Sequence, residues 1–196
     1  MNMNAKQLLH TNARIEIDDL LINVAKTLYE NKNCELPNKH EDLIFNYTMT
    51  FKPINKNNIN HIGIGYADTY IIDVYKDIYR DLCYELNGKN YYRMFSFQPF
   101  VLYYADKEGS KTGYIESDSK NNNHIHSIII IHPDVLNKWN QVNWEHYENR
   151  FSEIESIQVE KFDPTRGSIS TLRSYNGKSK EHKYDENYDL LPRNFL

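Results

Sequence analysis

The sequence is poor in cysteine, glycine and proline, and it contains no long apolar run. Its 196 residues include only 2 Cys, 7 Gly and 6 Pro. Two cysteines cannot build a disulfide framework or a four-thiolate zinc site, and so little glycine and proline excludes a fibrous chain. The longest aliphatic run, Ile128–Ile131, is far shorter than the roughly 20 residues that span a bilayer. These absences predict a reduced, intracellular protein without a membrane segment or a secretory signal.

Apolar and aromatic residues are plentiful. Hydrophobic residues make up 40% of the chain and aromatic residues 13%, with 16 Tyr, which is too many for a disordered protein. The formal net charge of −4 argues against nucleic-acid binding over the whole surface but not against a local basic patch. The length favours one compact unit, with an N-terminal helical extension over residues 1–40 and a main domain over 41–196.

The periodicity of the apolar residues predicts an α+β fold. Apolar residues recur at helical spacing in four segments, residues 14–31, 68–87, 133–149 and 168–175. Strand-like patterns cover residues 45–51, 95–104, 113–116, 124–132 and 154–162. Four consecutive isoleucines mark residues 124–132 as a central strand that is covered on both faces. We therefore expect an antiparallel sheet with helices on one face, in the split β-α-β arrangement of RRM-like domains.

Two histidines form the first candidate site. His124 and His126 are separated by one residue in a predicted strand, so their side chains point to the same face while Ile125 points to the other. Glu116 precedes them across a polar segment and can supply a carboxylate from the neighbouring strand. Two imidazoles with a carboxylate suit Mn²⁺ or Mg²⁺ better than structural zinc. Asp106 and Glu108 are alternative third ligands.

A basic segment forms the second candidate site. Residues 161–183 include six Lys or Arg and two Asp or Glu. The formal net charge of this window is therefore +4, and that of the remainder of the chain is −8. Tyr175 and Lys178 lie three residues apart within it. Arg166, Arg173 and Lys180 are candidate contacts to a nucleic-acid backbone. A tyrosine surrounded by positive charge and close to a metal site is what phosphodiester chemistry requires.

These motifs resemble those of a known family. Asn123–Ile131 (N-H-I-H-S-I-I-I-I) is similar to the His-hydrophobic-His motif of the HUH endonucleases, of the single-tyrosine type that initiates rolling-circle replication. Tyr175–Lys178 is similar to their Tyr-x-x-Lys motif, and residues 45–51 lie where their first strand motif lies. Glu116 matches the carboxylate that commonly completes the metal site in that family. No P-loop is present in the sequence, so no helicase motif accompanies the resemblance.

The resemblance implies a function. The family nicks and rejoins single-stranded DNA at a replication origin, in plasmids, phages or viruses, through a 5′-phosphotyrosine link. It implies Tyr175 as nucleophile, Lys178 as its assistant, and a host polymerase and helicase as partners, in the cytoplasm of a bacterial, archaeal or host cell. Tyr184 and Tyr188 are alternative nucleophiles. Two other functions stay open: a non-catalytic nucleic-acid-binding domain of RRM-like fold, and a hydrolase that uses the histidines and a carboxylate to hold its metal.

Overall fold

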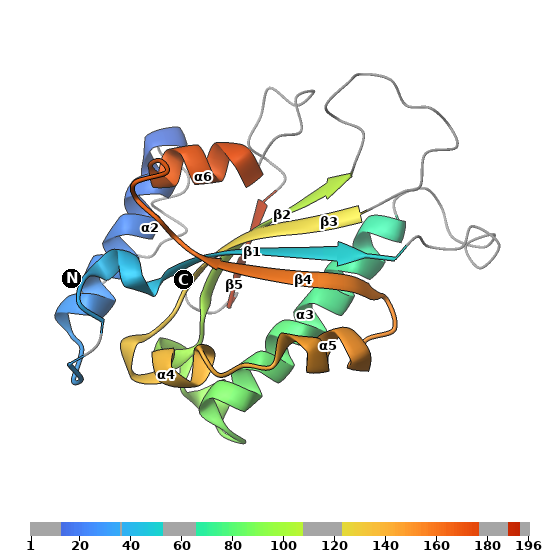
Figure 1. The fold of residues 1–196 in the computed structure, drawn as a ribbon, viewed down its shortest axis with the longest axis horizontal. Helices are drawn as coiled ribbons and strands as arrows, with labels where there is room; N and C mark the ends of the chain where they lie inside the picture. The colour runs from blue at the N-terminus through green and yellow to red at the C-terminus, as the bar shows by residue number, and fades with distance from the viewer. Residues whose placement is uncertain (1–12, 36, 53–65, 108–122, 177–187, 193–196) are drawn as a thin grey trace.

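The chain folds around one five-stranded antiparallel sheet in the order β4-β1-β3-β2-β5 (Figure 1). The computed structural model describes residues 13–35, 37–52, 66–107, 123–176 and 188–192. The strands are β1 (Ile44–Phe51), β2 (Phe100–Lys107), β3 (Asn123–Ile130), β4 (Ile154–Lys161) and β5 (Tyr188–Leu191). The helices are α2 (Ala13–Glu30), α3 (Tyr66–Asn87), α4 (Leu136–Trp139), α5 (Trp144–Arg150) and α6 (Ile169–Asn176), with 3-10 turns η1 (His40–Leu43), η3 (Tyr91–Arg93), η4 (Phe95–Phe97) and η5 (Pro133–Val135).

The predicted α+β class is confirmed, and β3 is the central strand as its isoleucines indicated. The helices predicted at 14–31, 68–87 and 168–175 and the strands at 45–51, 124–132 and 154–162 are present with small shifts at their ends. The predicted strand 95–104 begins only at Phe100, because the residues before it form 3-10 turns. The predicted strand 113–116 lies outside the described residues. The short strand β5 was not predicted.

The helix predicted over 133–149 is broken into η5, α4 and α5. The break follows Trp139, where the chain turns, and α5 begins again at Trp144. Asn143 provides the new helix start, since its side-chain oxygen accepts a hydrogen bond from the backbone N–H of His146 at 3.2 Å. The apolar periodicity spans the break, so it does not reveal the interruption.

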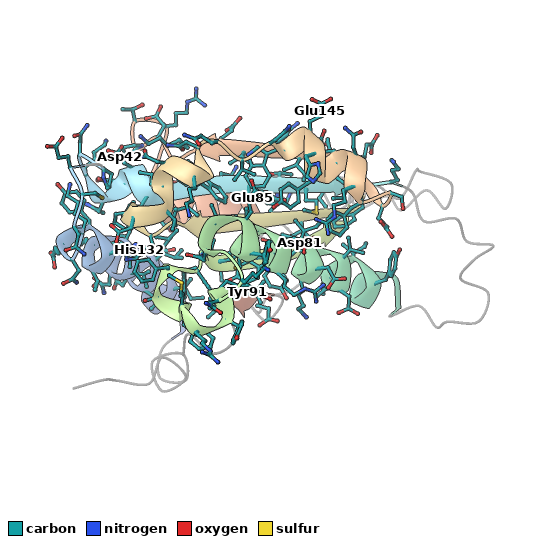
Figure 2. The ribbon with its side chains drawn as sticks, turned by 90° about the horizontal axis from the view of Figure 1, so that it is seen from below. Asp42, Asp81, Glu85, Tyr91, His132 and Glu145 are labelled. Atoms are coloured by element: carbon teal, nitrogen blue, oxygen red, sulfur yellow. The ribbon has the colours of Figure 1, made fainter. Side chains whose placement is uncertain are left out.

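One face of the sheet is covered by α3, α4 and α5 (Figures 1 and 2). Tyr75 of α3 contacts the ring of Tyr103 on β2, and its hydroxyl bonds the buried Ser127 hydroxyl of β3 at 2.7 Å. Tyr47 of β1 packs edge-on against Trp144 of α5, with ring centroids 5.4 Å apart. Arg150 of α5 pairs with Asp81 of α3 at 2.9 Å. These contacts fix the two helical segments to each other and to the sheet.

The other face also carries helices, which corrects the expectation that they lie on one face alone. In Figure 1, α2 and α6 lie side by side on the face opposite α3. They contact each other, and both contact β3. Ile17, Leu21 and Ala25 of α2 and Ile169 of α6 are buried in the core that the sheet shares. The N-terminal helix therefore closes part of the domain. Among the residues that the structure describes, no helix is long and apolar enough to cross a membrane.

Candidate functional site: a histidine pair on the polar half of a sheet face

The face that carries α2 and α6 changes character along the strands. Toward the end where β3 finishes, its residues are apolar and buried: Ile128, Ile130, Leu102 and Phe100 have exposed fractions of 0 to 1%. Toward the start of β3, the same face carries His124 and His126, and both are half-buried. Side chains two residues apart along a strand share a face. One strand thus passes from an apolar half of this face to a polar half.

The polar half consists of two rows of residues that cross the sheet in register. In one row, Ser156 of β4, Thr50 of β1, His124 of β3 and Asp106 of β2 are paired in turn. In the other row, Gln158, Thr48, His126, Tyr104 and Tyr188 follow from β4 to β5. The pairing of β1 with β4 shifts between Thr50 and Phe51. Such irregularities re-aim side chains and are common beside active sites.

The two imidazole rings lie side by side in the same orientation. Their centroids are 5.9 Å apart and their planes differ by 24°. The Nδ1 atom of His126 is 3.1 Å from the hydroxyl oxygen of Thr48, and the Nδ1 atom of His124 is 3.1 Å from that of Thr50. Each ring therefore bonds its direct cross-strand partner on β1 through the same nitrogen.

The separation of the two rings is within the range that two ligands of one metal ion allow. A metal–nitrogen bond of about 2.1 Å means that two imidazoles sharing one ion have centroids within roughly 6.5 Å of each other. The observed 5.9 Å meets this limit. Because Nδ1 of each ring is bonded to a hydroxyl, Nε2 is the nitrogen that would hold the ion, with the threonine as the outer partner that metal-bound histidines commonly have.

A third ligand is not identified by side-chain contacts. Among the residues described, no group of three or more His, Cys, Asp or Glu side chains comes together. Glu116 and Glu108, two of the three candidates from the sequence, lie outside the described residues. The backbone of the third, Asp106, is described, and it is paired with His124 in the register of β2 and β3. Directly paired residues have Cβ atoms about 4.5–5.5 Å apart.

The predicted nucleophile lies on a helix at the same face. Tyr175 and Arg173 belong to the last turns of α6, the helix that contacts β3 and α2. The start of this helix is capped, since the Ser168 hydroxyl accepts a hydrogen bond from the Thr171 N–H at 3.2 Å. Lys178, Lys180 and Tyr184 lie outside the described residues. Of the alternative nucleophiles, Tyr188 begins β5 and is paired with Tyr104 in the row that contains His126.

Two of the basic residues in the 161–183 window form ion pairs. Lys161 contacts Asp42 at 2.9 Å, and Arg166 contacts Asp163 at 3.5 Å. Hydrogen bonds from the Thr165 hydroxyl and N–H lower the pKa of Asp163, which keeps this carboxylate charged beside Arg166. The net charge of the segment is positive, but these two cations already have acidic neighbours.

Sequence reasoning missed Thr48 and Thr50 as members of the site. The signal was present in the alternation of residues 45–51, which puts polar side chains at every second position of a strand. The sequence does not show which strand lies beside the histidines or in which register. Comparisons with protein-family models, with curated proteins and with solved structures found no match to this chain.

Proposed function

We propose that the protein is a metal-dependent endonuclease and strand transferase that nicks and rejoins single-stranded DNA at a replication origin. The observation that carries the proposal is the matched pair of histidines on the polar half of a sheet face, 5.9 Å apart and each bonded through Nδ1. A helix that carries a tyrosine in its last turn borders the same face.

The proposed chemistry is a displacement at phosphorus. The Tyr175 hydroxyl loses its proton and attacks the scissile phosphate, the bond from phosphorus to the 3′-oxygen breaks, and that oxygen takes up a proton. A phenol with an ordinary pKa of about 10 is a weak nucleophile at neutral pH, and the proposed role of Lys178 is to favour the phenolate. Attack by the 3′-hydroxyl on the phosphotyrosine reverses the step and rejoins the strands.

In this proposal the two histidines are ligands of a divalent metal ion. A bound Mn²⁺ or Mg²⁺ would polarise the scissile phosphate. His124 and His126 would hold it through Nε2, with one carboxylate completing the set. The register favours Asp106 as that carboxylate, because it is the cross-strand partner of His124. Glu116 remains the choice implied by the family resemblance.

The described sheet face does not favour a purely binding function of the RRM type. Such domains stack unpaired bases on exposed aromatic side chains of the sheet. Here Tyr104 is in line with His126 but is only 6% exposed. The most exposed large aromatic side chains in the described part of the chain are Tyr84, Tyr92 and Phe95, and they lie on α3 and the turns that follow it.

The test is covalent capture of DNA. The full chain is incubated with Mn²⁺ and a pool of single-stranded oligonucleotides of random sequence, and adducts that survive denaturing electrophoresis are measured. We expect an adduct with the wild type and none with Tyr175→Phe, with His126→Ala or after chelation of the metal. Tyr188→Phe is the matched control and should leave the adduct unchanged. The absence of any wild-type adduct would contradict the proposal.

Two further outcomes refine the site. An adduct that persists in Tyr175→Phe and disappears in Tyr188→Phe would move the nucleophile to β5, and mass spectrometry of the DNA-linked peptide would verify it. Asp106→Asn and Glu116→Gln, compared by Mn²⁺ titration, separate the two carboxylates. Substitution of the true third ligand should weaken Mn²⁺ binding by at least about 10-fold, since even the loss of an outer-sphere partner has an effect of that size.

A further inference from the structure

Each histidine of the pair has its own threonine on β1. Thr48 contacts His126 and Thr50 contacts His124, in both cases between Oγ1 and Nδ1 and in both cases at 3.1 Å. Each threonine is also the residue directly opposite its histidine in the strand register. The arrangement is therefore one unit repeated two residues further along the same two strands.

A threonine in a strand is well suited to fix an imidazole. Its β-branched side chain is restricted in χ1, so its hydroxyl oxygen has a defined position once the strand is paired. Rotation of a histidine ring about χ2 is broad when nothing restrains it. A hydrogen bond at Nδ1 removes that freedom, and two such bonds set both rings at their observed 24° interplanar angle and 5.9 Å separation.

The same bond decides which nitrogen can hold a metal. A hydroxyl can either donate to a ring nitrogen or accept from it, so the contact by itself allows both tautomers. Metal binding at Nε2 requires its lone pair, which leaves the proton on Nδ1 to be donated to the threonine oxygen. Because both units pair the same two atoms, a metal bound at both Nε2 atoms would require the Nδ1–H tautomer in both rings.

We infer that Thr48 and Thr50 are positioning residues that orient the two imidazoles and hold them as Nδ1–H tautomers, so that Nε2 is the atom through which each ring would bind one divalent cation. This inference rests on the metal site of the proposed function. It goes beyond that function by assigning the tautomer and by giving two residues of β1 a role in metal affinity.

A merely structural role for the threonines predicts different results. Thr→Val keeps the β-branched shape and removes only the hydroxyl, whereas Thr→Ser keeps the hydroxyl. If the threonines only support strand pairing, Val should serve as well as Thr, since both are good strand residues. If they position the rings, Ser should rescue what Val loses. Ser156→Ala is the matched control, because Ser156 lies in the row of Thr50 and His124 but on the far side of Thr50 from the histidine.

The experiment measures Mn²⁺ affinity of the full chain by calorimetry or by electron paramagnetic resonance of free Mn²⁺. We expect Thr48→Val and Thr50→Val each to weaken binding by about 10-fold and the double variant by about 100-fold. The Thr→Ser variants and Ser156→Ala should stay close to the wild-type affinity. Wild-type affinity in the double valine variant would overturn the inference, and so would a wild type that binds no Mn²⁺.

A second measurement needs no variant, so a folding defect in the valine proteins cannot obscure it. Long-range proton–nitrogen NMR spectra of the Mg²⁺-loaded wild type should show the proton of both rings on Nδ1. A proton on Nε2 of either ring would overturn the inference. Threonine-dependent Mn²⁺ binding without any DNA adduct would support the inference and contradict only the proposed nuclease. Unchanged affinity after His124→Ala and His126→Ala would remove the metal site and with it both proposals.

Discussion

The two halves of β3 share one strand and one face but have different environments. His124 and His126 in the first half are half-buried, whereas Ile128 and Ile130 in the second half are completely buried. Their backbones are paired with the same two neighbouring strands. The difference comes from α2 and α6, which pack on this face of the sheet. A strand in the middle of a sheet can therefore supply both a core and a candidate site, where the described helices pack over only part of its face.

The largest expected difference between the halves is in stability. Ile128→Ala should lower the free energy of unfolding by about 2–5 kcal/mol, because it removes most of a fully buried side chain and leaves a cavity in its place. His126→Ala, two residues away on the same face, should cost less than about 1 kcal/mol, as is usual outside the core. Equilibrium denaturation in guanidinium chloride compares the two. Equal losses would mean that the polar half is as much a part of the core as the apolar half.

The opposite face of β3 offers a test of how a polar group is tolerated inside the core. Ser127→Ala should destabilise the protein by about 1–3 kcal/mol, because it leaves the buried Tyr75 hydroxyl without its partner. Tyr75→Phe should have a similar effect, because it leaves the buried Ser127 hydroxyl without its partner. The double variant should be more stable than the sum of the two losses predicts. Denaturation of all four proteins measures this coupling, and strictly additive losses would contradict it.

The smallest expected effect concerns His132, the histidine just beyond the apolar half. Burial lowers its pKa from the ordinary 6.5, and the nearby Asp134 offsets this only in part. The neutral ring accepts a hydrogen bond from the Asp134 N–H at 3.2 Å and caps η5. As pH falls below about 6.5 the unfolded chain takes up this proton before the folded one, so stability is lost toward acid pH.

Replacement of His132 by Asn should reduce this pH dependence, since Asn is a good cap that does not titrate. Denaturation midpoints at about pH 7.5 and about pH 5.5 should differ less in His132→Asn than in the wild type. An identical pH response of the two proteins would mean that His132 is not protonated on unfolding. His146, which is exposed and has no such cap role, is the control position for the same substitution.

Much of the fold could be predicted from local patterns. The helix over residues 14–31 and the strand over 45–51 are visible because an element that packs on one side repeats its apolar residues at a fixed spacing. The prediction was incomplete where a break is local and the pattern continues across it, as at Asn143, or where an element is very short, as in β5. The placement of α2 on the second face could not be predicted, because amphipathicity shows that a helix has a partner but not which one.

The candidate site, too, could be predicted from the sequence only in part. The shared face of His124 and His126 follows from their spacing, and the structure brings their rings together as the spacing requires. The threonines that bond them lie more than 70 residues away along the chain, and only the pairing of β1 with β3 joins the two sets. The roles of Tyr175 and Asp106 stay predictions that the DNA-capture and Mn²⁺ experiments test.

The sequence by itself determined the class of fold, the identity of the central strand and the common direction of its two histidines, because these depend on periodicity over a few residues. Only the tertiary structure decided which threonines the histidines bond and which half of their face α2 and α6 cover. Strand register and helix docking are set by surfaces that meet from distant parts of the chain, and no short stretch of sequence carries that information.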